Sequence, residues 1–179
     1  MTTAITVRAT TIEVTCGDLS AQSDVEALCL FVNRWLIPVG AAAQRVHHSA
    51  RQRLAALCKT LSPVDREEVV VVTEAFDLPN RVLFHCRELV QRRHPMYVAG
   101  LSAMYRRVLL ATEQQAVHSL ALEPLGCAAR VEGVWSEAAN HHRERRKVRD
   151  PLHPLKLLRF VMKEEGMVHS FRTELASSA

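Results

Sequence analysis

The amino-acid sequence predicts an α/β fold, in which helices cover both faces of a mixed, mostly parallel sheet in a three-layer α/β/α arrangement. Apolar or β-branched runs, typical of strands buried in such a sheet, recur along the chain. Segments of helical periodicity separate several of these runs, as parallel strands require. The 179 residues contain no linker or internal repeat, so we expect a single domain over 1–179 with a short flexible end near 176–179.

The first third of the chain predicts strands followed by a long helix. Residues 5–15 alternate β-branched and polar side chains, which predicts one or two strands that lead to a loop at Asp18. Residues 25–32 are almost wholly apolar, as in a strand buried on both faces, and Asn33 follows them. Residues 41–61 place apolar side chains at helical intervals with basic residues between them, which predicts an amphipathic helix.

The remainder of the chain predicts a hairpin and then alternating helices and strands. Two apolar runs at 67–76 and 81–89 are joined by turn-forming residues, so two strands follow each other directly. Periodicity then predicts helices at 97–117, 134–148 and 164–175, and strands at 119–122 and 155–162. The loops that follow parallel strands are expected to converge on one cleft.

The composition is that of an ordinary globular protein. A chain of this length can bury a core without disulfides or bound metal. Its five cysteines lie far apart, mostly in apolar runs, and are expected to be reduced thiols. The N-terminus lacks the features of a signal peptide, and charges interrupt every long apolar stretch. We therefore expect a cytoplasmic, intracellular location and no membrane partner.

The net charge of +4 is unevenly distributed. Residues 141–149, HHRERRKVR, contain five basic side chains and one acidic one. Our first interpretation is the solvated face of a helix, because no aromatic side chain lies in the run. Nucleic-acid binding by this segment is kept as an alternative.

Common catalytic and cofactor motifs are absent from the sequence. There is no dinucleotide or P-loop glycine motif, no nucleophile elbow, no zinc-protease motif and no C-x-x-C pair. The adjacent histidines at 47–48 and at 141–142 would point to different sides of a helix. We therefore expect neither a metal site nor a cofactor.

His85 and Cys86 are neighbours in a predicted strand, so their side chains should point to opposite faces of the sheet. They cannot then act together as a base and a thiol nucleophile. We interpret His85 as a core histidine whose hydrogen bonds are satisfied. Cys127 lies in a loop and is the better candidate for a reactive thiol, although a packing role is the simpler interpretation.

The order of several motifs resembles the macro domain family over nearly the whole chain. Gly17-Asp18-Leu19 follows the first strands, where the family has Gly-Asp-Ile/Leu. Asn33 matches the second asparagine of the family's Asn-x-x-Asn, and Leu30 replaces the first. Residues 73–79 match T-x-x-[YF]-x-L-P, and a strand with His85 follows. Phe160-Val161-Met162 and Phe171 are similar to the family's last strand and the aromatic residue after it.

This resemblance implies binding of ADP-ribose, free or attached to a protein. The Asp18 carboxylate would accept a hydrogen bond from the adenine amino group, and Asn33 would bind a ribose hydroxyl. The alternative for Asp18 is a helix cap or a turn. The ligand-binding residues that the resemblance implies are Asp18, Leu19, Asn33, Val39, Gly40, Ala41, Ala42, Leu125, Gly126, Cys127, Ala128, Ala129 and Arg130.

Both phosphate loops depart from the family pattern. The first keeps only Gly40 of the usual glycines, and the second has alanine where glycine is usual and gains Arg130. Added side chains restrict the backbone at the place where it must approach a diphosphate. Arg130 could pair with a phosphate or face solvent.

The residues that catalyse ADP-ribose removal in related hydrolases correspond here to Leu30 and to Ala43 or Gln44. Leucine and alanine cannot orient or deprotonate water. We therefore expect a binding module with weak or no hydrolase activity. One alternative is an active ADP-ribosyl hydrolase that uses Asn33 or Glu132. The other is an interaction module without a nucleotide ligand, which uses residues 141–149.

Overall fold

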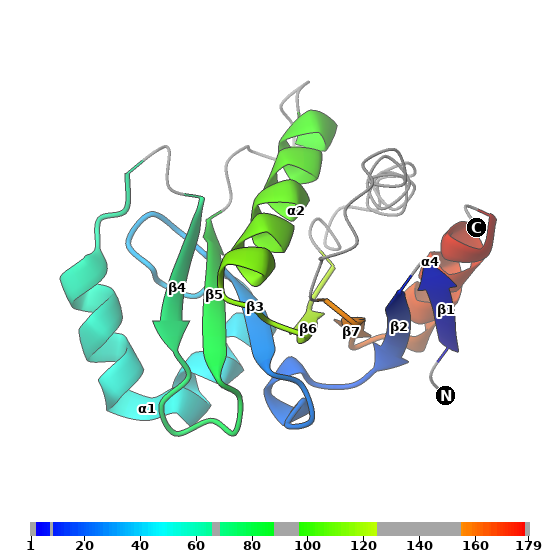
Figure 1. Ribbon diagram of the computed structural model, residues 1–179. Helices are drawn as coiled ribbons and strands as arrows, with labels where there is room; N and C mark the ends of the chain where they lie inside the picture. Colours follow the sequence, from blue (N-terminus) through cyan, green and yellow to red (C-terminus); the bar gives the residue numbers. More distant parts are fainter. Residues whose placement is uncertain (1–2, 8, 66–68, 88–96, 125–154, 178–179) are drawn as a thin grey trace.

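The structure is a computed structural model that describes residues 3–7, 9–65, 69–87, 97–124 and 155–177. Its seven-stranded sheet has the order β1-β2-β7-β6-β3-β5-β4 (Figure 1). The strands are β1 Thr3–Val7, β2 Thr10–Cys16, β3 Ala27–Val32, β4 Val70–Glu74, β5 Val82–Arg87, β6 Ser119–Leu122 and β7 Leu157–Met162. The helices are η1 Leu19–Ala21, α1 Ala41–Leu61, α2 Tyr97–Gln114 and α4 Glu165–Ser177.

The sheet is mixed and mostly parallel, as the sequence predicts. β2, β7, β6, β3 and β5 run parallel to their neighbours, whereas β1 and β4 pair antiparallel at the two edges. The carboxyl ends of the five parallel strands therefore lie along one edge of the sheet. In α/β folds this edge is where ligands bind.

Alternating side chains of the strands build two apolar cores, one on each face of the sheet. In β3, Leu28, Leu30 and Val32 join the core beneath α1, while Ala27 and Cys29 join the core beneath α2 and α4. Phe171 of α4 packs against Phe160 of β7 with ring centroids 4.8 Å apart. Helices thus cover both faces, which gives the predicted three layers (Figure 1).

Helix α1 has the bounds that its periodicity predicts, but it is not one straight helix. At Arg51 the backbone leaves the helical region, with φ 61° and ψ −159°, so that α1 consists of two helical segments at an angle (Figure 1). Neither proline nor glycine marks the break. The sequence therefore carries no signal for it.

Other predicted elements differ from the structure in small ways. The apolar run at 25–32 becomes a strand only from Ala27, and α4 extends to Ser177, into the segment expected to be flexible. The helix predicted at 134–148 lies outside the described residues. No helix in the described part of the chain is long and apolar enough to cross a membrane.

Candidate functional site

The carboxyl edge of the sheet gathers charged and polar side chains from four strands. Asp18 follows β2, Asn33 follows β3, Glu123 follows β6 and Lys163 follows β7. Because these strands run parallel and neighbour one another, their ends meet at one edge. The Asp18 and Asn33 loops belong to the convergence that the sequence predicts, whereas sequence analysis did not identify Glu123 and Lys163.

Asp18 caps the short helix η1, Leu19–Ala21. Its Oδ1 accepts hydrogen bonds from the Ser20 backbone N–H at 2.9 Å and from the Ser20 hydroxyl at 2.8 Å. The capping role considered for Asp18 on sequence grounds is therefore present in the structure. Leu19 is buried, so its side chain packs in the core beneath α1.

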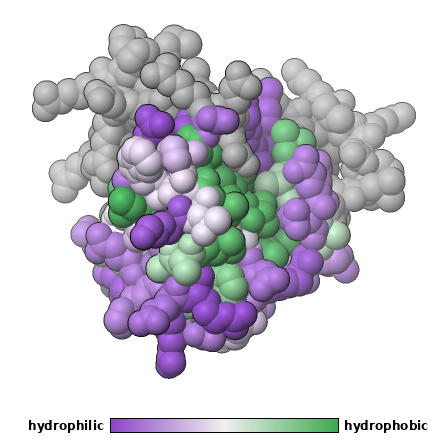
Figure 2. All heavy atoms as spheres, turned by 90° about the vertical axis from the view of Figure 1, so that its left-hand side faces the viewer, coloured by the Kyte–Doolittle hydropathy of each residue, from purple (hydrophilic) through white to green (hydrophobic). Residues whose placement is uncertain are grey.

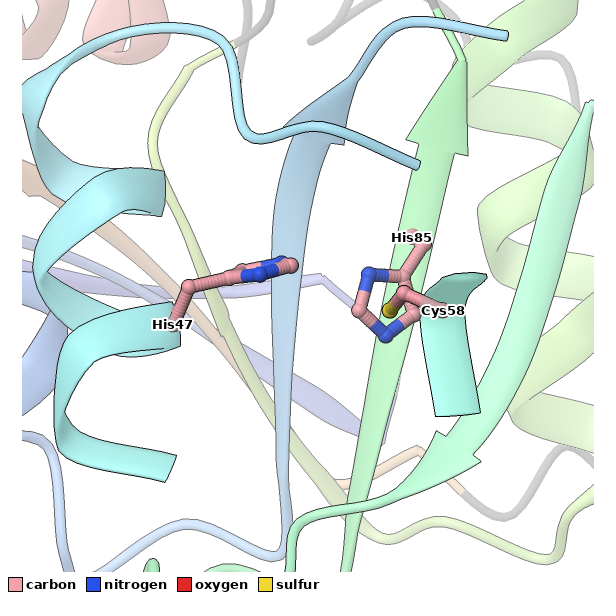
Figure 3. Close-up of side chains that lie close together, drawn as sticks. All are labelled: His47, Cys58 and His85. Atoms are coloured by element: carbon pink, nitrogen blue, oxygen red, sulfur yellow. The ribbon is translucent and has the colours of Figure 1, made fainter. Parts of the chain in front are cut away.

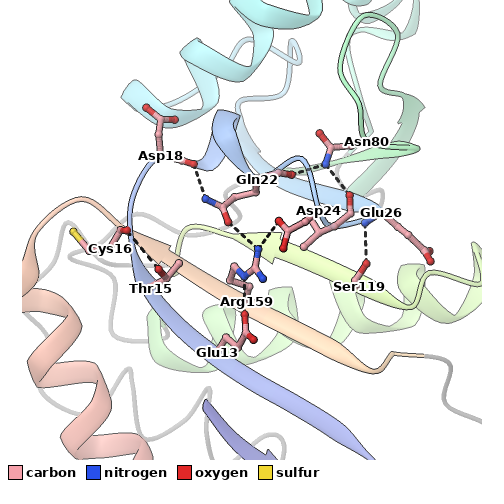
Figure 4. Close-up of polar contacts among 11 residues, drawn as sticks. Glu13, Thr15, Cys16, Asp18, Gln22, Asp24, Glu26, Asn80, Ser119 and Arg159 are labelled. Atoms are coloured by element: carbon pink, nitrogen blue, oxygen red, sulfur yellow. Dashed lines mark hydrogen bonds and ion pairs between the residues drawn. The ribbon is translucent and has the colours of Figure 1, made fainter. Parts of the chain in front are cut away.

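The segment that carries Asp18 is fastened to the sheet by Arg159 of β7 (Figure 4). The Arg159 guanidinium donates hydrogen bonds to Glu13 at 2.7 Å, to Gln22 at 3.0 Å and to Asp24 at 2.7 Å. Gln22 Nε2 in turn donates to the Asp18 backbone carbonyl at 2.9 Å. A charge-assisted network of this kind holds Asp18 in place before any ligand arrives.

Arg45 of α1 forms an ion pair with the Asp18 carboxylate and so ties this helix to the segment that follows β2. Its Nε lies against Asp18 Oδ2, while its Nη2 is buried with no hydrogen-bond acceptor among the described residues. Such a donor is costly to bury unless a partner arrives. Arg45 was missed because a basic residue on an amphipathic helix normally faces solvent.

The surroundings of Asp18 act on its pKa in opposite directions. Burial alone raises the pKa, but the hydrogen bonds from Ser20 and the Arg45 guanidinium together outweigh it. The pKa of Asp18 therefore lies below its ordinary value. Asp18 is a carboxylate at neutral pH, which is the form that accepts hydrogen bonds from an amino group.

Glu123 is a second carboxyl group at this edge, and its pKa is raised. Burial is the main cause, and the negative charge of Asp18 adds to it, while Arg45 and Lys163 act in the opposite direction. Four charged side chains therefore interact at this edge, namely Asp18, Arg45, Glu123 and Lys163. The sequence signal was available in retrospect, since Glu123 stands between a buried strand and Pro124.

Asn33 uses its side chain to hold the loop after β3. Its Oδ1 accepts hydrogen bonds from the backbone N–H groups of Trp35 at 2.8 Å and Ile37 at 3.1 Å. Its backbone N–H donates to the Ile37 carbonyl at 3.0 Å. Asn33 thus stabilises a turn. Only its side-chain nitrogen, Nδ2, is left for a ribose hydroxyl.

The loop then enters α1 at Gly40, which has φ 86°. An L-residue is strained at this angle, so this glycine is required by conformation. The first helical bond runs from the Gln44 N–H to the Gly40 carbonyl, and no side chain caps the helix. The N–H groups of Ala41 and Ala42 therefore lack partners within the helix. Ala41 is exposed and can meet an anion at this helix N-terminus, whereas Ala42 is buried.

Val39 does not contribute an amide as the resemblance implied. Its backbone N–H donates to the Phe31 carbonyl at 2.8 Å, which places residues 38–39 beside the end of β3. The Val39 side chain is 41% exposed, so it can only make apolar contact with a ligand. The other six implied residues, Leu125, Gly126, Cys127, Ala128, Ala129 and Arg130, lie outside the described residues.

The loop between β3 and α1 is also unusually apolar on its surface. Five large apolar side chains are exposed in the described part of the chain, and three of them, Trp35, Ile37 and Val39, lie in this loop. Figure 2 shows a face of the molecule on which apolar side chains gather among hydrophilic ones. Exposed apolar side chains beside uncapped amides are suited to a ligand with both a flat ring and a phosphate.

Comparison with known proteins gives structural matches only. The sequence matches no family model and no curated protein. The structure resembles the Oceanobacillus iheyensis macrodomain with ADP at 16% identity, covering 99% of this chain and 96% of that one, with a TM-score of 0.85.

Two other solved structures are similar. The Trypanosoma brucei macrodomain in complex with ADP has 16% identity and a TM-score of 0.73, with 92% of this chain and 68% of that one covered. The macro domain of ganglioside induced differentiation associated protein 2 has 18% identity and a TM-score of 0.75, with 92% and 83% covered.

The chain has the macrodomain fold. The fold that the sequence motifs predict is therefore confirmed. At identities of 16–18% the likeness concerns the fold, and the residues at the carboxyl edge must carry any statement about function.

Proposed function

We propose that the protein is a divergent macrodomain that binds ADP-ribose, or a related ADP-containing nucleotide, at the carboxyl edge of its sheet. The observation that carries the proposal is the pairing of a fixed carboxylate, Asp18, with the uncapped N-terminus of α1. The first accepts a hydrogen bond from an amino group, and the second binds an anion. Adenine and diphosphate provide these two groups in one molecule.

Arg45 supports the same ligand. Its Nη2 is a buried donor without an acceptor in the described part of the chain, beside the carboxylate proposed to bind adenine. A nucleotide phosphate or ring nitrogen would supply the missing acceptor. The ion pair does not use up Asp18, because a carboxylate offers about four acceptor positions.

The substituted first loop does not argue against a diphosphate. A Cβ at Gly40 would meet nothing within 4 Å, so the backbone is open to approach at this point. The structural neighbours include an Oceanobacillus iheyensis macrodomain variant with valine in place of a glycine, seen with ADPR. A macrodomain that carries valine in place of a glycine can therefore still hold this ligand.

We propose binding rather than hydrolysis as the main activity. Leu30, which stands where related hydrolases have asparagine, is 1% exposed, and Ala43 is buried in the core beneath α1. Neither residue can place or activate a water molecule. Asn33 already uses its side-chain oxygen in the loop, so it is poorly suited to replace them. ADP-ribosylated proteins are the partners that such a binding module would recognise.

The proposal is tested by the variant Asp18→Ser. A serine hydroxyl can still cap η1, but it removes the carboxylate that would bind adenine. We expect the affinity for ADP-ribose to fall about 10-fold or more, the range for a hydrogen bond to a charged group. Titration calorimetry measures this change, and thermal unfolding without ligand checks that the variant is folded.

A second variant provides the matched control. Asp77→Ser removes an exposed aspartate from the turn between β4 and β5. This turn lies at the amino end of β5, and therefore at the edge of the sheet opposite the proposed site. Its affinity should equal that of the parent protein. Equal affinity for ADP-ribose in Asp18→Ser and the parent would contradict the proposed site.

A further inference from the structure

Three side chains that sequence analysis did not connect meet between α1 and the sheet. His47 and Cys58 belong to the two segments of α1, and His85 belongs to β5 (Figure 3). Their candidate ligand atoms all lie within 4.8 Å of one another. Two histidine nitrogens and one cysteine sulfur are a donor set that suits zinc.

The kink at Arg51 makes this arrangement possible. In a straight helix, residues 47 and 58 would be about 16 Å apart along the axis, too far to share one ion. Because the backbone turns at Arg51, both segments bring a side chain to the same strand. This is the reason that the sequence indicated no metal site, since metal-site motifs place their ligands at short, regular spacings and these three residues lie 11 to 38 positions apart.

His85 is not the satisfied core histidine that the sequence suggested. It is fully buried, and its Nε2 contacts the Thr73 hydroxyl at 2.9 Å. Thr73 Oγ1 donates its own hydrogen to the Glu74 carbonyl at 3.1 Å, so it accepts the hydrogen of His85 Nε2. The other ring nitrogen, Nδ1, is then an unprotonated acceptor, and it is buried without a hydrogen-bond partner among the described residues.

His47 repeats this pattern from the helix side. Its Nε2 is also buried, and no residue in the described part of the chain hydrogen-bonds to it. Its ring meets the ring of His85 edge-on with centroids 5.4 Å apart. Two orphaned ring nitrogens beside one thiol are costly in a dry interior. A bound cation would satisfy both nitrogens at once.

We propose that His47, Cys58 and His85 bind one zinc ion, which ties both segments of α1 to strand β5. Tetrahedral zinc needs ligand atoms about 3.3–3.6 Å apart, so side chains now within 4.8 Å must close by about 1 Å. Thr73 orients His85 as outer hydrogen-bond partners do in known zinc sites. The described residues supply three ligands, which leaves a fourth position for water or another ligand.

His85 is already in the neutral form that binds zinc, whereas Cys58 must first lose its proton. Burial, assisted by the charge of His47, lowers the pKa of His85 to about 3, so its imidazole is neutral at physiological pH. Burial raises the pKa of the Cys58 thiol to about 11. Zinc binding therefore requires that the Cys58 S–H bond breaks, that its proton passes to solvent and that the sulfur electron pair bonds the metal.

The test uses metal-free protein titrated with Zn²⁺ or with Co²⁺, which reports a bound thiolate by its absorption. We expect a thiolate-to-cobalt band and a rise in Tm of about 5 °C or more at saturating Zn²⁺. Cys58→Ser should lose the cobalt band and the Tm rise. Cys16→Ser, at an exposed cysteine that ends β2 and is not one of the three proposed ligands, should keep both. Mg²⁺ should have no effect on Tm.

His47→Gln and His48→Gln form a second matched pair. His48 is exposed and adjacent in the same helix, so only His47→Gln should abolish the Tm rise with Zn²⁺. This pair also decides the matter if Cys58→Ser does not fold. Absence of a cobalt band in the parent protein, or effects of Zn²⁺ that persist in both Cys58→Ser and His47→Gln, would overturn the proposal. No nucleotide is present, so the result is independent of ADP-ribose binding.

Discussion

Asp18 combines an observed structural role, as the cap of η1, with the proposed role in ligand binding. One of its oxygens caps η1 through Ser20, and the other is paired with Arg45. The cap fixes the position of the carboxylate, and the Ser20 hydrogen bonds together with Arg45 lower its pKa. A carboxylate held in this way needs little reorganisation when an amino group arrives, which favours affinity.

Glu123 offers a test of the electrostatics at the same edge. Because its pKa is raised, the folded state binds its proton more tightly than the unfolded state. Stability is therefore lost as the pH rises from about 4.5 through the raised pKa. We expect Glu123→Gln to be more stable than the parent protein at neutral pH, with an advantage that shrinks toward pH 4.

Thermal unfolding of both proteins between pH 4 and pH 8 measures this difference. Glu164→Gln is the control, because Glu164 lies only a few residues beyond β7 and is exposed. Its Tm difference from the parent should change little over the same range. A Tm difference for Glu123→Gln that does not vary with pH would contradict a raised pKa for Glu123.

At the scale of the elements, the loop before α1 depends on one glycine. Gly40 adopts φ 86°, and a Cβ there would meet no other atom within 4 Å. The cost of Gly40→Ala is therefore conformational and not steric. With ψ 160° this is a backbone region that almost only glycine adopts. We expect a loss of about 1–3 kcal/mol in the free energy of unfolding, or roughly 2–12 °C in Tm.

Gly166→Ala is the matched control for this prediction. Gly166 lies in α4, has no positive φ and also has open space around its Cα. Alanine there should leave the stability unchanged or raise it by about 0.5–1 kcal/mol. Denaturant unfolding compares the two variants. Equal effects would show that the backbone conformation at Gly40 is not what requires glycine.

The helices and strands themselves were largely predictable, because the spacing of apolar residues along the chain indicates which side chains an element buries. The bounds of α1 and β6 follow the sequence pattern, and the doubly buried run before Asn33 correctly indicated a central parallel strand. The kink at Arg51 could not be predicted, since residue types that break helices are absent there. Both segments bury side chains in the core beneath α1, Val46 before the kink and Leu54 and Cys58 after it, and a local pattern does not encode this packing.

At the scale of the whole molecule, the sequence predicted the edge of the sheet but not the contacts between its loops. Asp18 and Asn33 were found because each ends a strand. Arg45 and Glu123 were missed because their importance depends on which strands become neighbours. The meeting of His47, Cys58 and His85 is of the same kind, since it joins residues far apart in the chain through tertiary packing.

We propose that this macrodomain fold binds an ADP-containing nucleotide at the carboxyl edge of its sheet. A zinc ion on the face beneath α1 would tie both segments of this helix to β5. Calorimetric titration of the unmodified protein with ADP-ribose, with AMP alongside, tests the nucleotide binding most directly. The account predicts saturable binding of ADP-ribose with micromolar affinity, and weaker binding of AMP because it lacks the second phosphate. No heat and no thermal shift with millimolar ADP-ribose would contradict it.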